Sequence, residues 1–236
     1  MRILVWLSGW VDSAVAAYLL KKEWHEVTAG FMINYLAPEG EYCPTKEDIE
    51  VAREVAAYLE IPFFTFVYIE EYSQKVLDYM YEWYKKWITP NPDIMCNSEI
   101  KFKAFLEEAM SLWFDAVATG HYARITKEIP LNKGVAKPGD FEANNIELFH
   151  LLKWIDPNKD QSYFLAWLNQ YQLSASLFPI GHLEKPKVRE IALEAWLPNA
   201  NRKDSQWICF VGKVDMHTFL EKKLEKKEGN IVDISG

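Results

Sequence analysis

The chain has 236 residues, half of them hydrophobic and a quarter charged, which suits one α/β domain and perhaps part of a second. Its net charge of −8 does not favour a general nucleic-acid binder, and three cysteines without a C-x-x-C pair argue against a disulfide framework or a simple zinc site. No signal peptide precedes the first apolar run and no run is long enough to span a membrane, so we expect a cytoplasmic protein without a membrane partner.

The first predicted unit occupies residues 2–22. Residues 3–7 form a short apolar run typical of a buried parallel strand, and residues 11–22 carry apolar side chains at helical spacing. The polar turn at residues 8–13 gathers N–H groups at a helix N-terminus, which is a ready anion site. The lysine of a Walker A loop is absent. On these residues alone, an ordinary strand-to-helix connection with serine and aspartate caps explains the turn equally well.

Strand and helix patterns then alternate along the chain. We expect strands at residues 26–34, 62–69, 115–124 and 146–154, and helices at residues 46–59, 71–86, 98–112, 187–195 and 215–226. Residues 125–145 and 201–212 read as loops, residues 156–165 as a polar cap leading into a helix, and residues 229–236 as a further strand. Four successive β–α units predict an α/β fold with a doubly wound parallel sheet, whose ligands bind at the carboxyl ends of the strands.

Four residues are expected to meet at that edge of the sheet. Ser8, Met32, Asp93 and Gly120 each fall at or after the end of a predicted strand or in the loop that follows. Because parallel strands end at a common edge, these residues indicate a single site.

Two cysteines lie in loops that could reach this site. Cys96 follows Asp93 just before a predicted helix, where the helix dipole favours a thiolate. Cys209 follows Arg202 on a loop that could fold back over the site. A buried, inert thiol explains either cysteine alone about as well, and Cys43 is interpreted as inert.

Tryptophan is unusually frequent, with ten residues against ten glycines. Trp24, Trp113 and Trp196 each follow a helical run, at the position where a left-handed residue, usually glycine, ends the helix. We hypothesise that these letters are misread glycines from a source in which UGA encodes glycine. A tryptophan-rich variant, or deliberate replacement of glycine, is the alternative.

Several segments resemble those of the tRNA-specific 2-thiouridylase family, the MnmA type of PP-loop ATPase. They are G-E-Y-C-P-T (40–45), T-P-N-P-D-I-M-C-N (89–97), I-K-F-K-A-F (100–105), A-T-G-H-Y-A-R (118–124), D-P-N-K-D-Q-S-Y-F-L (156–165) and K-D-S-Q-W-I-C-F-V-G (203–212). The turn at residues 8–13 resembles the family's S-G-G-x-D-S pyrophosphate loop. Tryptophan replaces the family's glycine at Trp10, Trp24, Trp87, Trp113, Trp154, Trp196 and Trp207. Trp6 is grouped with these, whereas Trp83 and Trp167 are less certain.

The resemblance implies an enzyme that uses ATP and Mg²⁺ to install sulfur at C2 of the wobble uridine of tRNA. It implies a persulfide on Cys209, supplied by a sulfur donor protein, Cys96 as partner thiol and Asp93 as general base. It places the nucleotide at Trp6, Leu7, Ser8, Gly9, Trp10, Val11, Asp12, Ser13, Met32 and Gly120. It places tRNA at Asn91, Pro92, Asp93, His121, Lys159, Asp160 and Gln161, with the uridine flipped out of its stack.

The family pattern also sets the expected domains. Residues 1–213 are interpreted as the catalytic domain and residues 214–236 as the start of a small central domain, without the family's C-terminal β-barrel. Because the side chain of Trp10 would occupy the space where phosphate approaches the backbone, we expect the chain to bind ATP poorly. Alternatives are another PP-loop ATPase, such as an amidotransferase-linked or argininosuccinate synthetase, an iron–sulfur thiolase using Cys43, Cys96 and Cys209, or an inactive tRNA- or nucleotide-binding remnant.

Overall fold

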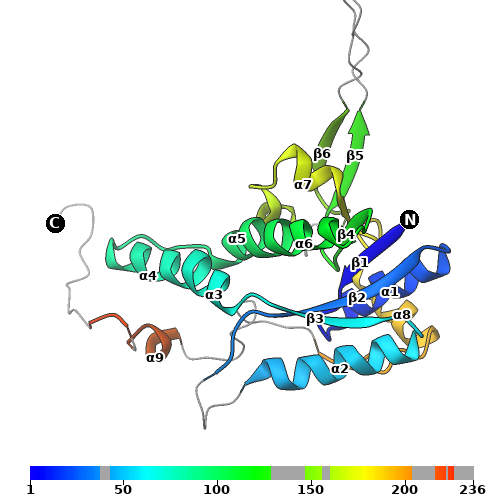
Figure 1. Cartoon of the computed structure of the whole chain (residues 1–236), viewed down its shortest axis with the longest axis horizontal. Helices are drawn as coiled ribbons and strands as arrows, with labels where there is room; N and C mark the ends of the chain where they lie inside the picture. The colour runs from blue at the N-terminus through cyan, green and yellow to red at the C-terminus, as the bar shows by residue number, and fades with distance from the viewer. Residues whose placement is uncertain (38–42, 129–146, 156–159, 204–215, 222, 226–236) are drawn as a thin grey trace, which may run out of the picture.

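A five-stranded parallel sheet forms the centre of the protein. The computed structural model describes residues 1–37, 43–128, 147–155, 160–203, 216–221 and 223–225. Within these residues the strand order is β3-β2-β1-β4-β7 (Figure 1). The strands are β1 (Arg2–Trp6), β2 (Glu26–Ile33), β3 (Phe63–Val67), β4 (Ala116–Ala118) and β7 (Ser176–Leu177). With β1 in the middle and every pair parallel, the sheet confirms the predicted doubly wound fold.

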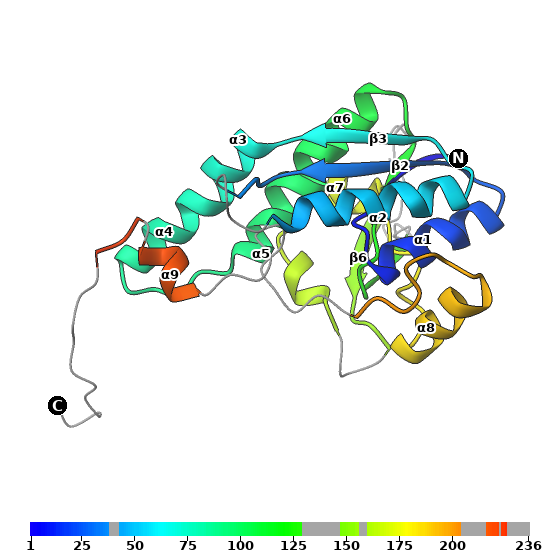
Figure 2. The same cartoon turned by 90° about the horizontal axis from the view of Figure 1, so that it is seen from below.

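Helices cover both faces of this sheet (Figures 1 and 2). On one face, α1 (Val11–Lys22), α2 (Pro44–Tyr58) and α8 (Lys185–Glu194) share a core. On the other face lie two helical runs, made of α3 (Ile69–Tyr72), η1 (Ser73–Leu77) and α4 (Asp78–Lys85), and of α5 (Pro92–Met95), η2 (Cys96–Ala104) and α6 (Phe105–Ser111). Alternation along β1 sends Ile3 and Val5 into the first core and Leu4 into the second. This explains why the whole strand reads as apolar.

The second of these runs begins earlier than expected. The helix predicted to start at residue 98 begins at Pro92, whose fixed φ suits the first turn of a helix. Asn91 caps it, because its side chain accepts a hydrogen bond from the Ile94 N–H at 3.2 Å. Asp93 and Cys96 therefore lie inside the helical run rather than in a loop before it.

The region after β4 also differs from the prediction. The strand expected over residues 115–124 ends at Ala118, and part of the expected loop forms β5 (Arg124–Glu128). This strand pairs with β6 (Leu148–Leu152) in an antiparallel ribbon. Beyond it come η3 (Ser162–Leu165), α7 (Gln170–Ser174) and β7, followed by α8 and then α9 (Met216–Glu221). The strand expected at residues 229–236 lies outside the described residues.

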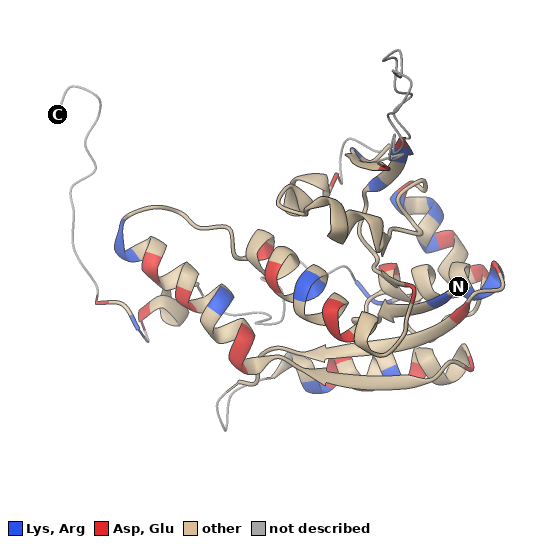
Figure 3. Ribbon diagram, turned by 45° about the horizontal axis from the view of Figure 1, so that its top comes forward, with Lys and Arg blue, Asp and Glu red and all other residues tan. Residues whose placement is uncertain are grey.

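Charged side chains are interspersed along the helices rather than gathered in one basic patch in the view of Figure 3. Lys85 pairs with Glu82 at 2.6 Å and Lys103 with Glu99 at 2.9 Å, each within one helical turn. Lys85 and Lys103 accordingly lie on solvated helix faces. In the described part of the chain, no helix has the length and apolar character needed to cross a membrane.

Five helices among the described residues end on a residue with a left-handed backbone, and four of these residues are tryptophan. They are Trp24 (φ 65°), Trp87 (φ 59°), Trp113 (φ 64°), Trp196 (φ 52°) and Glu60 (φ 50°). Paired hydrogen bonds close each helix: the Trp24 N–H donates to the Lys21 carbonyl and the His25 N–H to the Leu20 carbonyl, for example. The four indoles are 76–92% exposed, so little packing compensates the strain of a β-carbon there. The three predicted positions are confirmed, and Trp87 adds a fourth.

The other described tryptophans do not share this geometry. Trp154 is buried, packs on Tyr122 with ring centroids 4.2 Å apart, and donates from its indole to the Leu183 carbonyl at 2.7 Å. Trp83 lies within α4, and Trp10 has an ordinary φ of −93°. Backbone conformation therefore supports the misreading hypothesis at four positions only, and Trp207 lies outside the described residues.

Candidate functional site

The turn between β1 and α1 forms an open helix N-terminus at the carboxyl edge of the sheet. Gly9 has φ 83°, and a β-carbon there would lie 2.6 Å from the Asp48 carbonyl oxygen, so only glycine fits. Trp10 is the N-cap residue of α1, and its side chain makes no capping hydrogen bond. The N–H groups of the first turn of α1 are thus left for another acceptor. An anion such as a phosphate is the ligand that such a turn attracts.

Two serine hydroxyls close this turn. The Ser8 N–H donates to Ser13 Oγ at 3.1 Å, and the two Oγ atoms lie 3.0 Å apart. Ser13 Oγ in turn donates to the Trp10 carbonyl at 2.9 Å. The predicted residues Ser8 and Ser13 therefore lie together, and their hydroxyls hold the loop in its shape.

Asp12 faces away from the serines and ties the turn to other elements. Its Oδ1 accepts a hydrogen bond from the Tyr122 hydroxyl at 2.5 Å and pairs with Lys185 Nζ of α8 at 2.6 Å. Gly120 packs directly on this turn, because a β-carbon there would lie 2.7 Å from the Ser13 backbone nitrogen. Gly120 was predicted to lie near this turn, and the structure shows that its backbone packs directly on the backbone of Asp12 and Ser13.

The ends of β1 and β2 supply Trp6 and Met32, which were both predicted to line the nucleotide site. Met32 of β2 is fully buried in the second core. Trp6 lies beneath Lys101 of η2, whose Nζ is 4.2 Å from the centroid of the Trp6 ring. Lys101 is itself buried, which is rare for a lysine, and places a positive charge beside the loop. Sequence reasoning missed it, although the family-like segment I-K-F-K contains it.

Asp93 and Cys96 lie on the helical run opposite this turn. Cys96 is fully buried in the second core. Asp93 lies in α5, which packs against η3. Burial first, and then the charge of Asp93, raise the pKa of the Tyr163 hydroxyl in η3. Cys209 falls in residues 204–215, outside the described residues.

Cys43 is the N-cap residue of α2 and is partly exposed. Burial works to raise the pKa of its thiol, but hydrogen bonds with Ala37, Thr45 and Lys46 outweigh burial and leave the pKa below its ordinary value. This environment favours the thiolate more than the sequence suggested. It makes Cys43 the natural control for the other two cysteines.

Two of the residues predicted to contact tRNA, Asp160 and Gln161, accept hydrogen bonds from backbone N–H groups near β5 and β6. Asp160 Oδ1 accepts hydrogen bonds from the Trp154 and Ser162 N–H groups, at 3.2 and 3.0 Å. Although partial burial opposes it, these bonds lower the pKa of the Asp160 carboxyl. Gln161 Oε1 accepts from the Tyr122 N–H at 3.0 Å. Both side chains thus order the segment next to the pyrophosphate-type turn, and Lys159 lies outside the described residues.

His121 is buried, although it was predicted to contact tRNA. Its ring packs against Trp6, Phe102 and Phe178, and its Nδ1 lies 2.7 Å from Thr119 Oγ1. Burial, together with the charge of Lys101, holds the pKa of the imidazole well below its usual value. This environment favours the neutral imidazole, and only 7% of His121 is exposed for a contact with tRNA.

A His121→Asn variant should lose a pH dependence of stability. In the parent chain only the unfolded state binds a proton on this imidazole below about pH 6.5. Its lowered pKa in the folded state thus contributes stability that is present at pH 7.5 and lost as the pH falls. Between pH 7.5 and 5.5 this loss is on the order of 1 kcal/mol in the free energy of unfolding. Urea denaturation at the two pH values measures it, and an equal loss in the variant would contradict the neutral ring.

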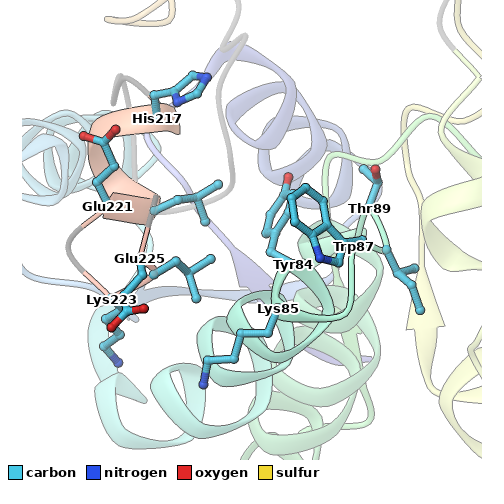
Figure 4. A pocket seen from close by; sticks show the side chains of 11 residues that line it. Tyr84, Lys85, Trp87, Thr89, His217, Glu221, Lys223 and Glu225 are labelled. Atoms are coloured by element: carbon cyan, nitrogen blue, oxygen red, sulfur yellow. The ribbon is translucent and has the colours of Figure 1, made fainter. Parts of the chain in front are cut away.

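A separate cavity of about 780 Å³ lies between α4 and α9 (Figure 4). Tyr84, Lys85 and Trp87 line one side and His217, Glu221 and Lys223 the other. None of the predicted site residues lines this cavity, and neither does any residue of the turn at residues 8–13. The site is therefore assigned from the turn rather than from this cavity.

Comparisons with known proteins agree with the family that the sequence motifs indicated. Residues 1–213 match the family model described as the tRNA methyl transferase HUP domain. The tRNA-specific 2-thiouridylase MnmA of Flavobacterium johnsoniae is 48% identical over 236 residues, covering 99% of this chain and 56% of its own length. That of Alkaliphilus oremlandii is 43% identical, with 100% and 60% covered. The chain thus spans little more than half the length of these curated relatives.

Two solved structures share the fold at low sequence identity. The U34-tRNA thiolase NcsA from Methanococcus maripaludis has a TM-score of 0.52 at 16% identity, covering 94% of this chain and 63% of its own. The NMN synthetase from Francisella tularensis has a TM-score of 0.50 at 15% identity, with 86% and 66% covered. At these identities the likeness concerns the fold alone. The family model and the curated relatives together confirm the resemblance, and the chain belongs to the tRNA methyl transferase HUP domain family, which it shares with relatives named as 2-thiouridylases.

Proposed function

We propose that this protein transfers sulfur to C2 of the wobble uridine of tRNA, in an ATP-dependent reaction that forms 2-thiouridine. Relatives that are 43–48% identical across the chain carry the name of that activity. The observation that carries the proposal is the uncapped N-terminus of α1, with Gly120 packed against it. It offers a phosphate site in a chain that also carries two candidate reactive thiols.

The nucleotide would bind along this edge of the sheet. Its phosphates would accept hydrogen bonds from the N–H groups at the start of α1, and Met32 and Gly120 would border the rest of the nucleotide. The proposed set is Trp6, Leu7, Ser8, Gly9, Trp10, Val11, Asp12, Ser13, Met32 and Gly120. In the described part of the chain no cluster of histidine, cysteine and carboxylate side chains could hold a metal ion. Mg²⁺ would be bound through the phosphates of the nucleotide.

The reaction needs both a leaving group and a sulfur nucleophile. The uridine O2 attacks the α-phosphorus of ATP, pyrophosphate leaves, and Asp93 accepts the proton released from the base. The terminal sulfur of a Cys209 persulfide then attacks C2, and AMP departs with the former O2. The Cys96 thiolate attacks Cys209 Sγ, which breaks the sulfur–sulfur bond to the base and forms a disulfide between the two cysteines. A thiol reductant and a persulfide donor protein regenerate the enzyme.

The tRNA would be bound by the start of the α5 run and by the segment around η3. The proposed contacts are Asn91, Pro92, Asp93, His121, Lys159, Asp160 and Gln161. These two segments lie next to each other, because α5 contacts η3. Residues 1–213 as a catalytic domain, residues 214–236 as the start of a second domain and a cytoplasmic location remain predictions.

A thiolation assay tests the proposal directly. The chain is incubated with unmodified tRNA, ATP, Mg²⁺ and a persulfide donor, both alone and joined to the C-terminal portion of the Flavobacterium johnsoniae relative. We expect 2-thiouridine at the wobble position, detected by mass spectrometry of the nucleosides, only when ATP is present. Formation of product without ATP, or none in either form even with glycine at position 10, would contradict the proposal.

Replacing Trp10 by glycine should raise the affinity for ATP at least tenfold, or by about 1.4 kcal/mol. An indole at the N-cap cannot accept a hydrogen bond from the first-turn N–H groups, and we expect its bulk to compete with the phosphates for the space beside them. The indole lies on the α2 side of the turn, with the Arg202 guanidinium 4.0 Å from its ring. Isothermal titration measures the change. Ordinary ATP affinity in the Trp10 form would show that the indole does not obstruct the site.

A further inference from the structure

The carbonyl oxygen of Gly9 is held by two side chains from far along the chain. Asn199 Nδ2 donates to it at 2.9 Å and Arg202 Nη1 at 3.1 Å. Asn199 is only 5% exposed, and the Arg202 side chain is largely buried. Both residues come from the segment after α8. A loop carbonyl with two dedicated donors is fixed in direction more strongly than the rest of its turn.

Arg202 is itself held in place. Its Nη2 pairs with Asp48 of α2 at 2.6 Å, and its guanidinium stacks on Trp10. Burial raises the pKa of the Asp48 carboxyl, and the charge of Arg202 opposes that rise. Arg189 of α8 donates to the carbonyls of Ala200 and Arg202, at 3.1 and 2.5 Å. The donors are therefore anchored by two helices of the same layer, α2 and α8.

Because the Gly9 carbonyl is anchored, the direction of the N–H group of residue 10, in the same peptide, is fixed as well. A trans peptide is planar, with its C=O and N–H pointing in opposite directions. The Gly9 carbonyl points at Asn199 and Arg202, so the N–H of residue 10 points away from them, next to the uncapped turn of α1. Glycine is permissive in ψ as well as in φ, so Gly9 alone does not select the orientation of the peptide that follows it. The selection comes from the two donors.

We propose that Asn199 and Arg202 are positioning residues that pre-orient the Gly9–Trp10 peptide, and with it the pyrophosphate-binding N–H groups of the turn. The inference rests on the proposed function, because it specifies how that nucleotide site is built. Arg202 also lies a short way before Cys209 in the sequence. Arg202 itself contacts, at the Gly9 carbonyl, the loop that would bind the leaving pyrophosphate.

The test compares Arg202→Met and Asn199→Ala with Arg53→Met as matched control, since Arg53 pairs with Glu50 on the outer surface of the same α2 helix. All are made in the Trp10→Gly chain, where the hydrogen bonds to the Gly9 carbonyl remain possible. Inorganic pyrophosphate is titrated by calorimetry, and the amide resonance of residue 10 is recorded by NMR without ligand. We expect pyrophosphate affinity to fall at least tenfold in Arg202→Met and several-fold in Asn199→Ala. Both variants should shift the residue 10 amide before ligand is added, and Arg53→Met should change neither.

The outcomes separate the possible failures. Unchanged affinity in both variants overturns the positioning role. Weaker binding with an unmoved residue 10 amide means that Arg202 contacts the phosphate directly, which also overturns it. If the Trp10→Gly chain binds neither pyrophosphate nor ATP, the proposed nucleotide site itself fails. If Arg202→Met does not fold, as thermal melts would reveal, the smaller Asn199→Ala change decides alone.

Discussion

Cys209→Ala should abolish 2-thiouridine formation, lowering the rate by a factor on the order of 10³ or more, as for other lost nucleophiles. In the proposed reaction the sulfur carried by residue 209 attacks C2, and alanine cannot carry a persulfide. Adenylation of the uridine precedes that step and should persist. Mass spectrometry of nucleosides from the reacted tRNA measures the product, and labelled ATP measures adenylated tRNA. Thiolation that survives in this variant would remove Cys209 from the mechanism.

The other two cysteines provide the comparison. Cys96→Ser should also stop turnover, because no second thiol releases the sulfur from Cys209. Cys43→Ala should retain activity, although hydrogen bonds outweigh burial and hold the thiol pKa of Cys43 below its usual value. Equal loss in all three variants, with the absorbance of an iron–sulfur cluster under anaerobic conditions, would favour a cluster held by three cysteines instead.

Much of the fold was predictable because its central strands are buried on both faces. Such strands read as continuous apolar runs, as in residues 3–5, and β1 and β2 each lead into a long helix, α1 and α2. The turn at residues 8–13 could be recognised for the same reason, since its polar residues interrupt two strong patterns. Gly9 was selected from the family resemblance and Gly120 already from its place at the end of a predicted strand, and the structure supplies the physical reason in their close backbone contacts.

The rest depends on contacts that leave no local pattern. β7 is two residues long and exists only through its pairing with β4, so no periodicity marks it. The pairing of β5 with β6 connects segments separated by residues outside the described structure. The hydrogen bonds from Asn199 and Arg202 to Gly9 join opposite ends of the chain. Lys101 looked like one more surface lysine until the fold buried it.

Replacing the four left-handed tryptophans by glycine should stabilise the protein substantially. A β-carbon at such a position costs about 1–2 kcal/mol, and the greater freedom of glycine in the unfolded chain returns about 0.5–1 kcal/mol of that. With four separate helix ends, the net gain is about 2–4 kcal/mol in the free energy of unfolding. For a chain of this size the melting temperature should rise by about 4–16 °C. The changes are Trp24→Gly, Trp87→Gly, Trp113→Gly and Trp196→Gly, followed by calorimetry.

Two single variants show whether backbone conformation is the cause. Glu60→Gly changes the same helix-ending position at a residue that is not tryptophan, and should stabilise by a similar single increment. Trp83→Gly lies inside α4 and should destabilise by about 1 kcal/mol, as glycine does within a helix. If all four glycine variants lower the melting temperature, the indoles stabilise the fold in spite of their exposure. The gene gives an independent answer, because UGG codons at these four positions would end the misreading hypothesis, whereas UGA codons there would make glycine the residue that the fold already requires.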